Sequence, residues 1–172
     1  MDYCRAFILE SALADILKEA NRFLSKETGG PLCGYVSEDN AIVITHAAGP
    51  GKKAIRKMFS VTICGESAQK FCDEIFRRSS GFFDYVGDWH SHIGCSVRYS
   101  PPDVDAMVMM ASFIHSPTKN PISLIYSRIT GKFALYALNG SGHLEFLSCH
   151  IIKSIPEGTA STTGTNPKSW TV

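Results

Sequence analysis

The stretch GDWHSH occupies residues 87–92, and SPPD follows it at residues 100–103 after a gap of seven residues. Residues 83–90 are rich in aromatic and β-branched types, which is typical of a β-strand. Side chains two positions apart on a strand point to the same face, so we expect His90 and His92 to project together while Ser91 points away. The stretch therefore predicts a strand that ends in two histidines on one face.

The SPPD segment predicts the start of a helix, joined to this strand by a loop over residues 93–99. Ser100 suits the N-cap position and Pro101 suits the first helical position. Asp103 then falls at the capping-box position, with Asp in place of the usual Glu. Apolar residues follow at helical spacing and predict a buried stripe, namely Val104, Met107, Val108, Ala111 and Ile114.

Two histidines and one aspartate are the kind of donor set found in catalytic zinc sites, which use three protein ligands and keep one position for water. His90, His92 and Asp103 are therefore the predicted ligands of a Zn²⁺ ion. Glu27, beside a glycine pair, is a candidate for the carboxylate that takes and returns the proton of that water. A structural metal site, or polar residues satisfied by hydrogen bonds, is the alternative, but a closed structural zinc site usually has four Cys or His ligands. The pattern favours a metal-dependent hydrolase.

These residues resemble the pattern of the JAMM (JAB1/MPN/Mov34) metallopeptidases, in which an upstream glutamate precedes H-[ST]-H, seven residues and S-x-x-D. The matching positions are Glu27, His90, His92, Ser100 and Asp103, and the resemblance covers roughly residues 3–150. It implies hydrolysis of a peptide or isopeptide bond, with Zn²⁺ on the three ligands, Glu27 moving the proton and Ser100 stabilising the oxyanion. It also implies an α/β, JAB1/MPN-like layered fold, a mixed β-sheet flanked by helices and similar to cytidine deaminases.

Within that family, the size of the chain and the phrase YVGDWHSH at residues 85–92 look like the compact bacterial members. Those members are encoded beside activating-type and conjugating-type enzymes, as in the CBASS operons of antiphage defence. The resemblance thus implies a conjugated protein substrate, either a ubiquitin-like protein or a cyclic-nucleotide synthase (CD-NTase) joined through its C-terminus to a target. Ile93 stands where bacterial members often have proline. This difference leaves the predicted metal ligands in place and affects the geometry of the loop expected to contact the substrate.

Three other functions compete with a processing or deconjugating peptidase. An inactive MPN-type scaffold that binds a ubiquitin-like partner is disfavoured by the complete five-residue set. A relative of the DNA-repair type is disfavoured by the formal net charge of +1, because nucleic-acid binding usually needs a basic patch. A Cys–His hydrolase would need a thiol paired with a histidine, and the H-x-H pattern explains the histidines better. The sequence leaves open the substrate, the preference for linear or isopeptide bonds, and the oligomeric state.

Composition predicts one domain over residues 1–153 and a flexible tail over 154–172, where few apolar residues occur. No apolar run reaches the ~20 residues of a membrane span, and the N-terminus lacks the pattern of a signal peptide, so we expect a cytoplasmic protein that binds neither membrane nor nucleic acid. Six scattered cysteines predict reduced thiols. Cys95 is the exception to watch, since it lies in the loop between the predicted ligands.

The rest of the chain predicts alternating strands and helices. A strand at 6–9 precedes a helix that Ser11 caps and that runs to about Ser25, with an apolar face of Leu13, Ile16, Leu17, Ala20 and Leu24. Residues 32–36 and 40–47 predict a hairpin, and the basic residues from Lys52 to Lys57 a solvated loop or a contact surface for the substrate. A helix at 65–79 and strands at 121–127, 132–139 and 143–150 follow. The other histidines, which we expect to be structural or exposed, are His46, His115, His143 and His150.

Overall fold

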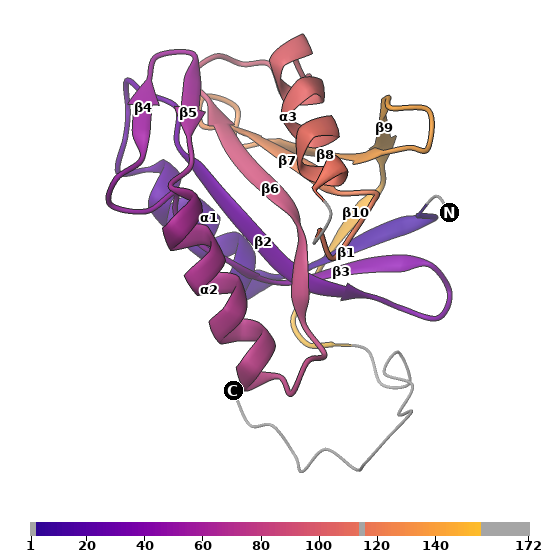
Figure 1. Cartoon of the computed structure of the whole chain (residues 1–172). Helices are drawn as coiled ribbons and strands as arrows, with labels where there is room; N and C mark the ends of the chain where they lie inside the picture. The colour runs from indigo at the N-terminus through magenta and orange to yellow at the C-terminus, as the bar shows by residue number, and fades with distance from the viewer. Residues whose placement is uncertain (1–2, 114–115, 156–172) are drawn as a thin grey trace.

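The computed structural model describes residues 3–113 and 116–155, which form an α/β fold with a mixed sheet and flanking helices (Figure 1). The three helices of this described part are α1 (Glu10–Ala20), α2 (Gly65–Arg78) and α3 (Pro101–Ser112). The strands are β1 (Arg5–Leu9), β2 (Gly29–Val36), β3 (Ala41–Ala47), β4 (Ile55–Lys57), β5 (Ser60–Thr62), β6 (Asp84–His92), β7 (Ile122–Ser127), β8 (Phe133–Leu138), β9 (Leu144–Leu147) and β10 (Cys149–Ile152). The predicted class, a mixed sheet flanked by helices, is confirmed.

Strand β6 lies inside an eight-stranded sheet whose order is β10-β1-β3-β2-β6-β7-β8-β9, while β4 and β5 pair separately. β6 runs antiparallel to β2 and parallel to β7. Because of these directions, the carboxyl end of β6 lies beside the beginning of β2, where Gly29 pairs with His90. Two segments that are far apart in the sequence thus meet at the strand end that carries the two histidines.

The sheet has helix α1 on one face and helices α2 and α3 on the other (Figure 1). Leu124 and Ile125 are neighbours on β7 and point to opposite faces, as the pleat requires. Leu124 belongs to the core cluster that includes Ile16 of α1, whereas Ile125 belongs to the cluster that includes Met107 of α3. His90 pairs with Ile125 in the register, so His90 lies on the α3 face.

A β-bulge interrupts β6 before the two histidines. Leu32 of β2 pairs with Gly87, but the next residue, Cys33, pairs with Tyr85, so β6 has one extra residue here. Gly87 is needed at the bulge because a Cβ at this position would lie 2.0 Å from the backbone oxygen of Ile122. After the bulge, the strand alternates regularly to His92.

The first predicted helix differs from the structure at both of its ends. The first helix begins after Leu9, without Ser11 as its cap, and ends at Ala20 rather than near Ser25. Asn21 and Arg22 donate to carbonyls of the last helical turn, and the chain then leaves the helix axis. Helical spacing therefore no longer applies to Leu24, whose side chain is 73% exposed rather than part of the apolar face.

The predicted strand at 143–150 is two strands that pair with different partners. β9 pairs with β8, and β10 pairs with β1 at the other end of the sheet order. Ser148 lies between them, and its carbonyl accepts a hydrogen bond from the Ala6 N–H at 2.7 Å. The two ends of the sheet order are therefore joined through one short stretch of chain.

Within the basic segment, Lys52 and Lys53 lie in a turn, as a loop prediction requires, whereas Arg56 and Lys57 belong to the hairpin β4–β5. The predicted stripe on α3 is also only partly buried: Met107 is buried, but Val108 is exposed, and Ile114 lies outside the described residues. The predicted tail lies outside them from residue 156 onward. Among the described residues, no helix has the length and the apolar character that a membrane crossing needs.

Candidate metal centre

His90 and His92 project together from the end of β6, as the sequence predicted. Their Nε2 atoms lie 3.1 Å apart. Ser91 between them is fully buried and faces the other way, where its hydroxyl accepts a hydrogen bond from the Thr28 N–H at 3.1 Å. Gly29 allows β2 to approach this close, because a Cβ there would lie 2.3 Å from the Trp89 oxygen and 3.1 Å from the His90 Cα.

Asp103 reaches the histidines from the first turn of α3. Its Oδ1 lies 3.3 Å from His90 Nε2, and the two side chains are 18% and 14% exposed, respectively. Its other oxygen, Oδ2, accepts the N–H of Ser100 at 2.6 Å and the hydroxyl of Ser100 at 2.7 Å. The cap of the helix thus holds one carboxylate oxygen and leaves the other directed at His90.

The orientation of His92 is set by the loop that follows it. Its Nδ1 lies 2.9 Å from the carbonyl oxygen of Ser96. Since a carbonyl can only accept, Nδ1 carries the proton in this contact and Nε2 keeps a free lone pair, the usual arrangement for a metal-binding histidine. Two more carbonyl groups of this loop accept hydrogen bonds. The Gly94 carbonyl accepts from the Ser127 hydroxyl at 2.8 Å, and the Val97 carbonyl accepts from the Tyr136 hydroxyl at 3.0 Å.

Glu27 lies just before β2 and is only 7% exposed. Its N–H donates to the Lys57 oxygen of the β4–β5 hairpin at 2.8 Å. Burial, and secondly the nearby Asp103 carboxylate, raise the pKa of Glu27 to about 7. A carboxyl group with such a pKa can both accept and release a proton near neutral pH.

The electrostatics of His90 favour the neutral ring. Burial lowers the pKa of His90 to about 4, His92 acts in the same direction, and Asp103 opposes both. A neutral imidazole offers the lone pair that a metal needs. His90 can therefore act as a ligand without first losing a proton at neutral pH.

The geometry and chemistry of these three side chains fit a metal ion. One ligand atom from each of His90, His92 and Asp103 lies within 4.8 Å of the other two. His90 Nε2 lies 3.1 Å from His92 Nε2 and 3.3 Å from Asp103 Oδ1. These distances agree with tetrahedral coordination, in which metal–ligand bonds of about 2.0–2.1 Å separate neighbouring ligand atoms by about 3.3 Å. This group could hold a metal, as its residue types predicted.

Other residues singled out in the sequence lie apart from this group. Cys95 is an exposed, free thiol and is not among the three clustered side chains. His143 and His150 are exposed, and His46 is half-buried against Thr45, with 2.9 Å between its Nδ1 and the threonine Oγ1. His115 lies outside the described residues. The six cysteines are free, including Cys33 and Cys72, whose sulfur atoms are 3.5 Å apart.

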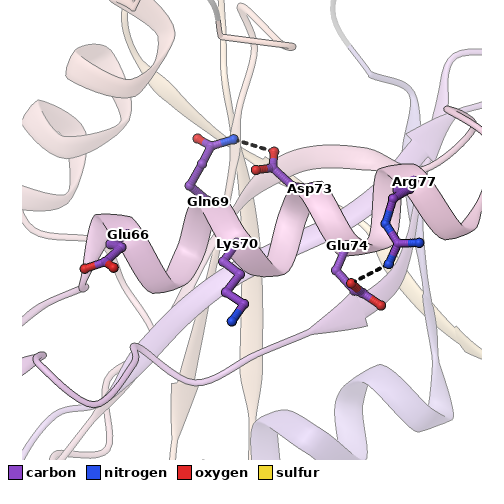
Figure 2. A pocket seen from close by; sticks show the side chains of 6 residues that line it. All are labelled: Glu66, Gln69, Lys70, Asp73, Glu74 and Arg77. Atoms are coloured by element: carbon purple, nitrogen blue, oxygen red, sulfur yellow. Dashed lines mark hydrogen bonds and ion pairs between the residues drawn. The ribbon is translucent and has the colours of Figure 1, made fainter.

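A shallow hollow of about 390 Å³ lies on α2 (Figure 2), and none of the three clustered side chains lines it. Its lining residues are polar or charged, carry both signs of charge, and come from a single helix: Glu66, Gln69, Lys70, Asp73, Glu74 and Arg77. Two pairs within it, Gln69–Asp73 and Glu74–Arg77, satisfy one another by hydrogen bonds. It is a solvated helix face and offers no converging ligand atoms.

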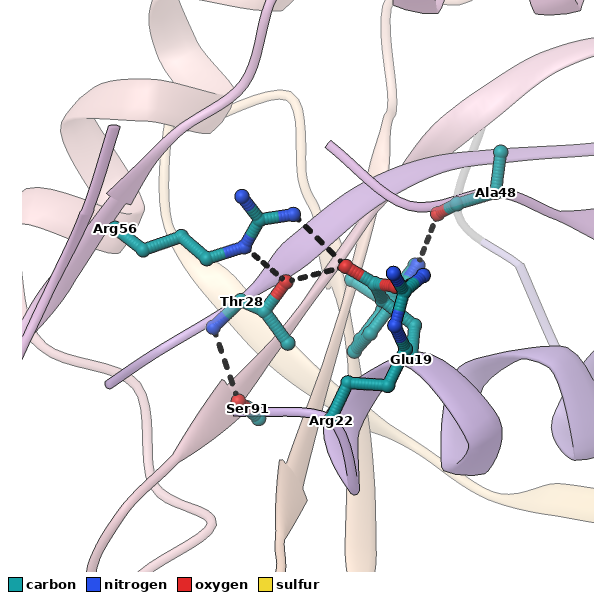
Figure 3. Close-up of polar contacts among 7 residues, drawn as sticks. Glu19, Arg22, Thr28, Ala48, Arg56 and Ser91 are labelled. Atoms are coloured by element: carbon teal, nitrogen blue, oxygen red, sulfur yellow. Dashed lines mark hydrogen bonds and ion pairs between the residues drawn. The ribbon is translucent and has the colours of Figure 1, made fainter. Parts of the chain in front are cut away.

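A polar network next to Glu27 contains residues that the sequence did not single out together. Arg56 belongs to the basic segment predicted as a solvated loop or a contact surface for the substrate, yet it forms a largely buried ion pair with Glu19 of α1 at 2.9 Å (Figure 3). Thr28 and Ser91 join the same network. The sequence carries no signal for this pairing, because the two charged residues are 37 positions apart and lie on elements of different kinds.

Comparison with known proteins agrees with this geometry, although no family model matches the chain. The chain is 40% identical over 86 residues to the probable metalloprotease y4qB of Sinorhizobium fredii, covering 50% of this chain and 52% of that protein. It is 34% identical over 70 residues to a CD-NTase/cGAS isopeptidase of Escherichia coli, covering 41% of this chain and 44% of that protein. The chain resembles a JAB-like peptidase.

The matched region of this JAB-like chain spans about half the length of these curated relatives. Among solved structures, protein DSY2949 from Desulfitobacterium hafniense superposes with a TM-score of 0.66, covering 91% of this chain and 99% of that one. At 14% identity, this likeness concerns the fold alone. The resemblance predicted from the motif is thus supported by the relatives, and the α/β architecture by the solved structure.

Proposed function

We propose that this chain is a zinc-dependent peptidase or isopeptidase of the JAMM type. The observation that carries the proposal is the convergence of His90 Nε2, His92 Nε2 and Asp103 Oδ1 within 4.8 Å, beside a buried glutamate. Two neutral imidazoles and one carboxylate are the donor set of catalytic zinc sites, which keep a fourth position for water or substrate. When bound, zinc supplies a Lewis acid that polarises a carbonyl group and lowers the pKa of a water molecule toward about 7.

Glu27 would serve as the general base and then as the general acid. With a pKa of about 7, this carboxyl group can take up and release a proton near neutral pH. In the proposed reaction, its carboxylate accepts a proton from the attacking water and delivers it to the leaving amine. Its low exposure keeps bulk water from competing for that proton.

Ser100 would donate to the oxyanion of the tetrahedral intermediate. Its hydroxyl now donates to Asp103 Oδ2 at 2.7 Å, and a hydroxyl has only one proton to give. Rotation about the Cβ–Oγ bond would free this proton, while the Ser100 N–H, 2.6 Å from the same oxygen, keeps Asp103 in place. The Ser100 hydroxyl can therefore donate either to Asp103 or to the oxyanion without a change in the backbone.

The substrate that we propose is a protein joined through its C-terminus to a target, namely a CD-NTase or a ubiquitin-like protein. The support is the similarity to the relative named CD-NTase/cGAS isopeptidase. The proposal includes the JAB1/MPN-like layered fold over residues 1–153 with a tail at 154–172, a cytoplasmic role in antiphage defence, and operon-encoded activating or conjugating enzymes as functional partners. Neither nucleic acid nor membrane is a proposed partner.

The test is a cleavage assay on fusions in which a candidate partner, a CD-NTase or a ubiquitin-like protein, is followed by an extra C-terminal segment. Zinc-loaded enzyme should cut after the last residue of the partner. Cleavage should be lost in Glu27→Ala with zinc still bound, and in wild-type enzyme treated with a chelator. An alkylator of thiols should have no effect, which separates this mechanism from a Cys–His hydrolase.

If zinc-loaded enzyme cuts neither these fusions nor lysine-linked conjugates of the same partners, the peptidase proposal is wrong. Stable binding of the partner without cleavage would then indicate a scaffold. Retained turnover in zinc-loaded Glu27→Ala would remove Glu27 from the mechanism while leaving the metal site intact.

A further inference from the structure

Four polar side chains from α1, β4, β6 and the residue before β2 form one network beside the candidate metal centre (Figure 3). Arg56 Nη2 donates to Glu19 Oε1 at 2.9 Å, and Arg56 Nε donates to Thr28 Oγ1 at 3.2 Å. The Thr28 hydroxyl in turn donates to Glu19 Oε1 at 3.1 Å. The three side chains form a closed triangle in which the threonine hydroxyl both donates and accepts.

Among the Lys/Arg–carboxylate ion pairs of the described residues, this is the one in which both side chains are largely buried. The side chains of Arg56 and Glu19 are 17% and 12% exposed, whereas those of Lys53 and Glu66 are 80% and 81% exposed. The guanidinium carbon of Arg56 also lies 4.0 Å from the centre of the Phe23 ring. Exposed pairs of long side chains contribute little to stability. Arg56 instead uses two N–H groups of one rigid guanidinium to hold two partners, Glu19 and Thr28, at the same time.

The network leads directly to Glu27. Thr28, the next residue, is tied to β6 by two bonds with Ser91, one from its N–H at 3.1 Å and one to its carbonyl at 2.7 Å. Glu27 itself donates its N–H to Lys57, the residue after Arg56, at 2.8 Å. The backbone of Glu27 is therefore held on one side by the strand that carries His90 and His92, and on the other by the hairpin that carries Arg56.

We infer that the Glu19–Arg56 pair, acting through Thr28, is a positioning device that holds Glu27 at the reaction site. The inference rests on the proposed function, in which Glu27 moves the proton. Proton transfer needs the carboxylate within about 2.6–3.2 Å of its partner, and a misplacement of about 1 Å can reduce turnover roughly 100-fold. Glu19, Arg56 and Thr28 are positioning residues and not catalytic ones.

The test compares Arg56→Met with Arg77→Met in the zinc-loaded full chain. Arg56→Met keeps the apolar stem over Phe23 and removes the guanidinium group. Arg77→Met is the matched control, because Arg77 also pairs with a glutamate, Glu74, but both are exposed on α2. Amide hydrogen exchange at Glu27 and Thr28 reports their anchoring directly, and zinc content reports the ligands.

In Arg56→Met, we expect exchange at both amides to rise about 10-fold or more, with exchange at Leu124 in the sheet core and the zinc content unchanged. On a cleaved fusion substrate, kcat should fall roughly 10- to 100-fold with KM unchanged. Arg56→Lys should restore only part of the wild-type exchange and kcat. A single ammonium group cannot hold Glu19 and Thr28 in the geometry that two N–H groups of a guanidinium give. Arg77→Met should behave as wild type.

A second pair of variants keeps the inference falsifiable if Arg56→Met does not fold. Thr28→Val preserves shape and removes the hydroxyl, while Thr28→Ser keeps it, so only the first should loosen Glu27 and lower kcat. Equal exchange in Arg56→Met and wild type, a rise spread over the whole sheet, or equal behaviour of Thr28→Val and Thr28→Ser would overturn the inference. If the wild-type enzyme cleaves nothing, the proposed function fails, and the exchange data still decide whether the pair holds Glu27.

Discussion

Helices α1 and α3 have nearly the same length, 11 and 12 residues, yet they are held to the sheet in different ways. α1 buries Ala12, Ile16 and Ala20 in the main core. α3 buries only Met107 fully; Val104, Ala106, Met110 and Ala111 are partly buried against the core, and Val108 and Met109 are exposed. The first helix is thus fixed by fully buried residues along its length, and the second by one buried residue, partly buried neighbours and the cap at its start.

The difference matters because each helix supports one carboxylate of the candidate site. Glu27 follows α1 and relies on a buried ion pair with that helix. Asp103 lies in the first turn of α3, where Ser100 binds it twice and two prolines stiffen the turn. A ligand that a cap holds does not require its whole helix to be buried, so changes along α1 and along α3 should have unequal effects.

The largest effect is expected at the start of α3, where Asp103→Asn retains the shape and removes the charge. We expect bound zinc to fall well below one ion per chain and cleavage to drop by about 1,000-fold or more, since one of three protein ligands is lost. Elemental analysis of the purified variant and the fusion-cleavage assay measure both. Full zinc occupancy in this variant would show that the assignment of Asp103 as a ligand is wrong.

The different packing of the two helices should appear as different losses in the free energy of unfolding when a buried side chain of each is truncated. Ile16→Ala in α1 should lower the free energy of unfolding by about 3–4 kcal/mol, because Ile16 is fully buried in the main core. Met107→Ala in α3 should cost about 2 kcal/mol, because an exposed helix can settle into the space. Urea unfolding of the metal-free proteins measures both, and equal costs would mean that α3 is anchored by packing after all.

The protonation of Glu27 should appear as a pH dependence of stability in the metal-free protein. Its pKa of about 7 in the folded chain exceeds the ordinary value of 4.5, so the folded state binds this proton more tightly than the unfolded state. The stability from this proton is present at low pH and is lost as pH rises through 7. Glu27→Gln should therefore match wild type near pH 4 and exceed it by about 1–3 kcal/mol at pH 8.

Glu66→Gln is the control for this prediction, because Glu66 is exposed on α2. Its difference from wild type should not change between pH 4 and pH 8. A stability gap for Glu27→Gln that stays constant with pH would contradict the raised pKa of Glu27.

The smallest effect is expected on the exposed face of α3. Met109→Gln keeps the length and the helix propensity of the side chain, and Met109 is 54% exposed. The free energy of unfolding should change by less than about 0.5 kcal/mol, and bound zinc should not change. A loss of more than about 1 kcal/mol in urea unfolding would show that Met109 packs against the protein.

The parts of the fold and site that the sequence predicted depend on short-range rules. His90 and His92 share a face because strand side chains alternate, and Asp103 faces inward because a cap three residues earlier starts the helix. Both rules operate over a few residues, so one chain is enough to apply them. The metal-binding roles of these residues and the roles of Glu27 and Ser100 stay predictions until zinc and turnover are measured.

The parts that the sequence did not predict depend on long-range contacts. Arg56 lies in a segment that looks solvated, and its partner Glu19 is fixed only when β4 docks near α1. Ser148 looks like an ordinary strand residue, yet the chain changes sheet partner there. Helical spacing also placed Val108 in a buried stripe, yet Val108 is 43% exposed where α3 lies against the rest of the chain. None of these outcomes has a local cause.

The register between β2 and β6 has a consequence for the order in which the site forms during folding. His90 and Asp103 are 13 positions apart, whereas Thr28, next to Glu27, meets Ser91 across 63 positions. Closing the longer loop costs roughly 1.4 kcal/mol more in free energy, because more chain entropy is lost, and it also requires two strands to pair. We therefore expect a refolding or newly made chain to gather the three candidate ligands first and to gain its proton carrier last, so that metal capture precedes the ability to cut.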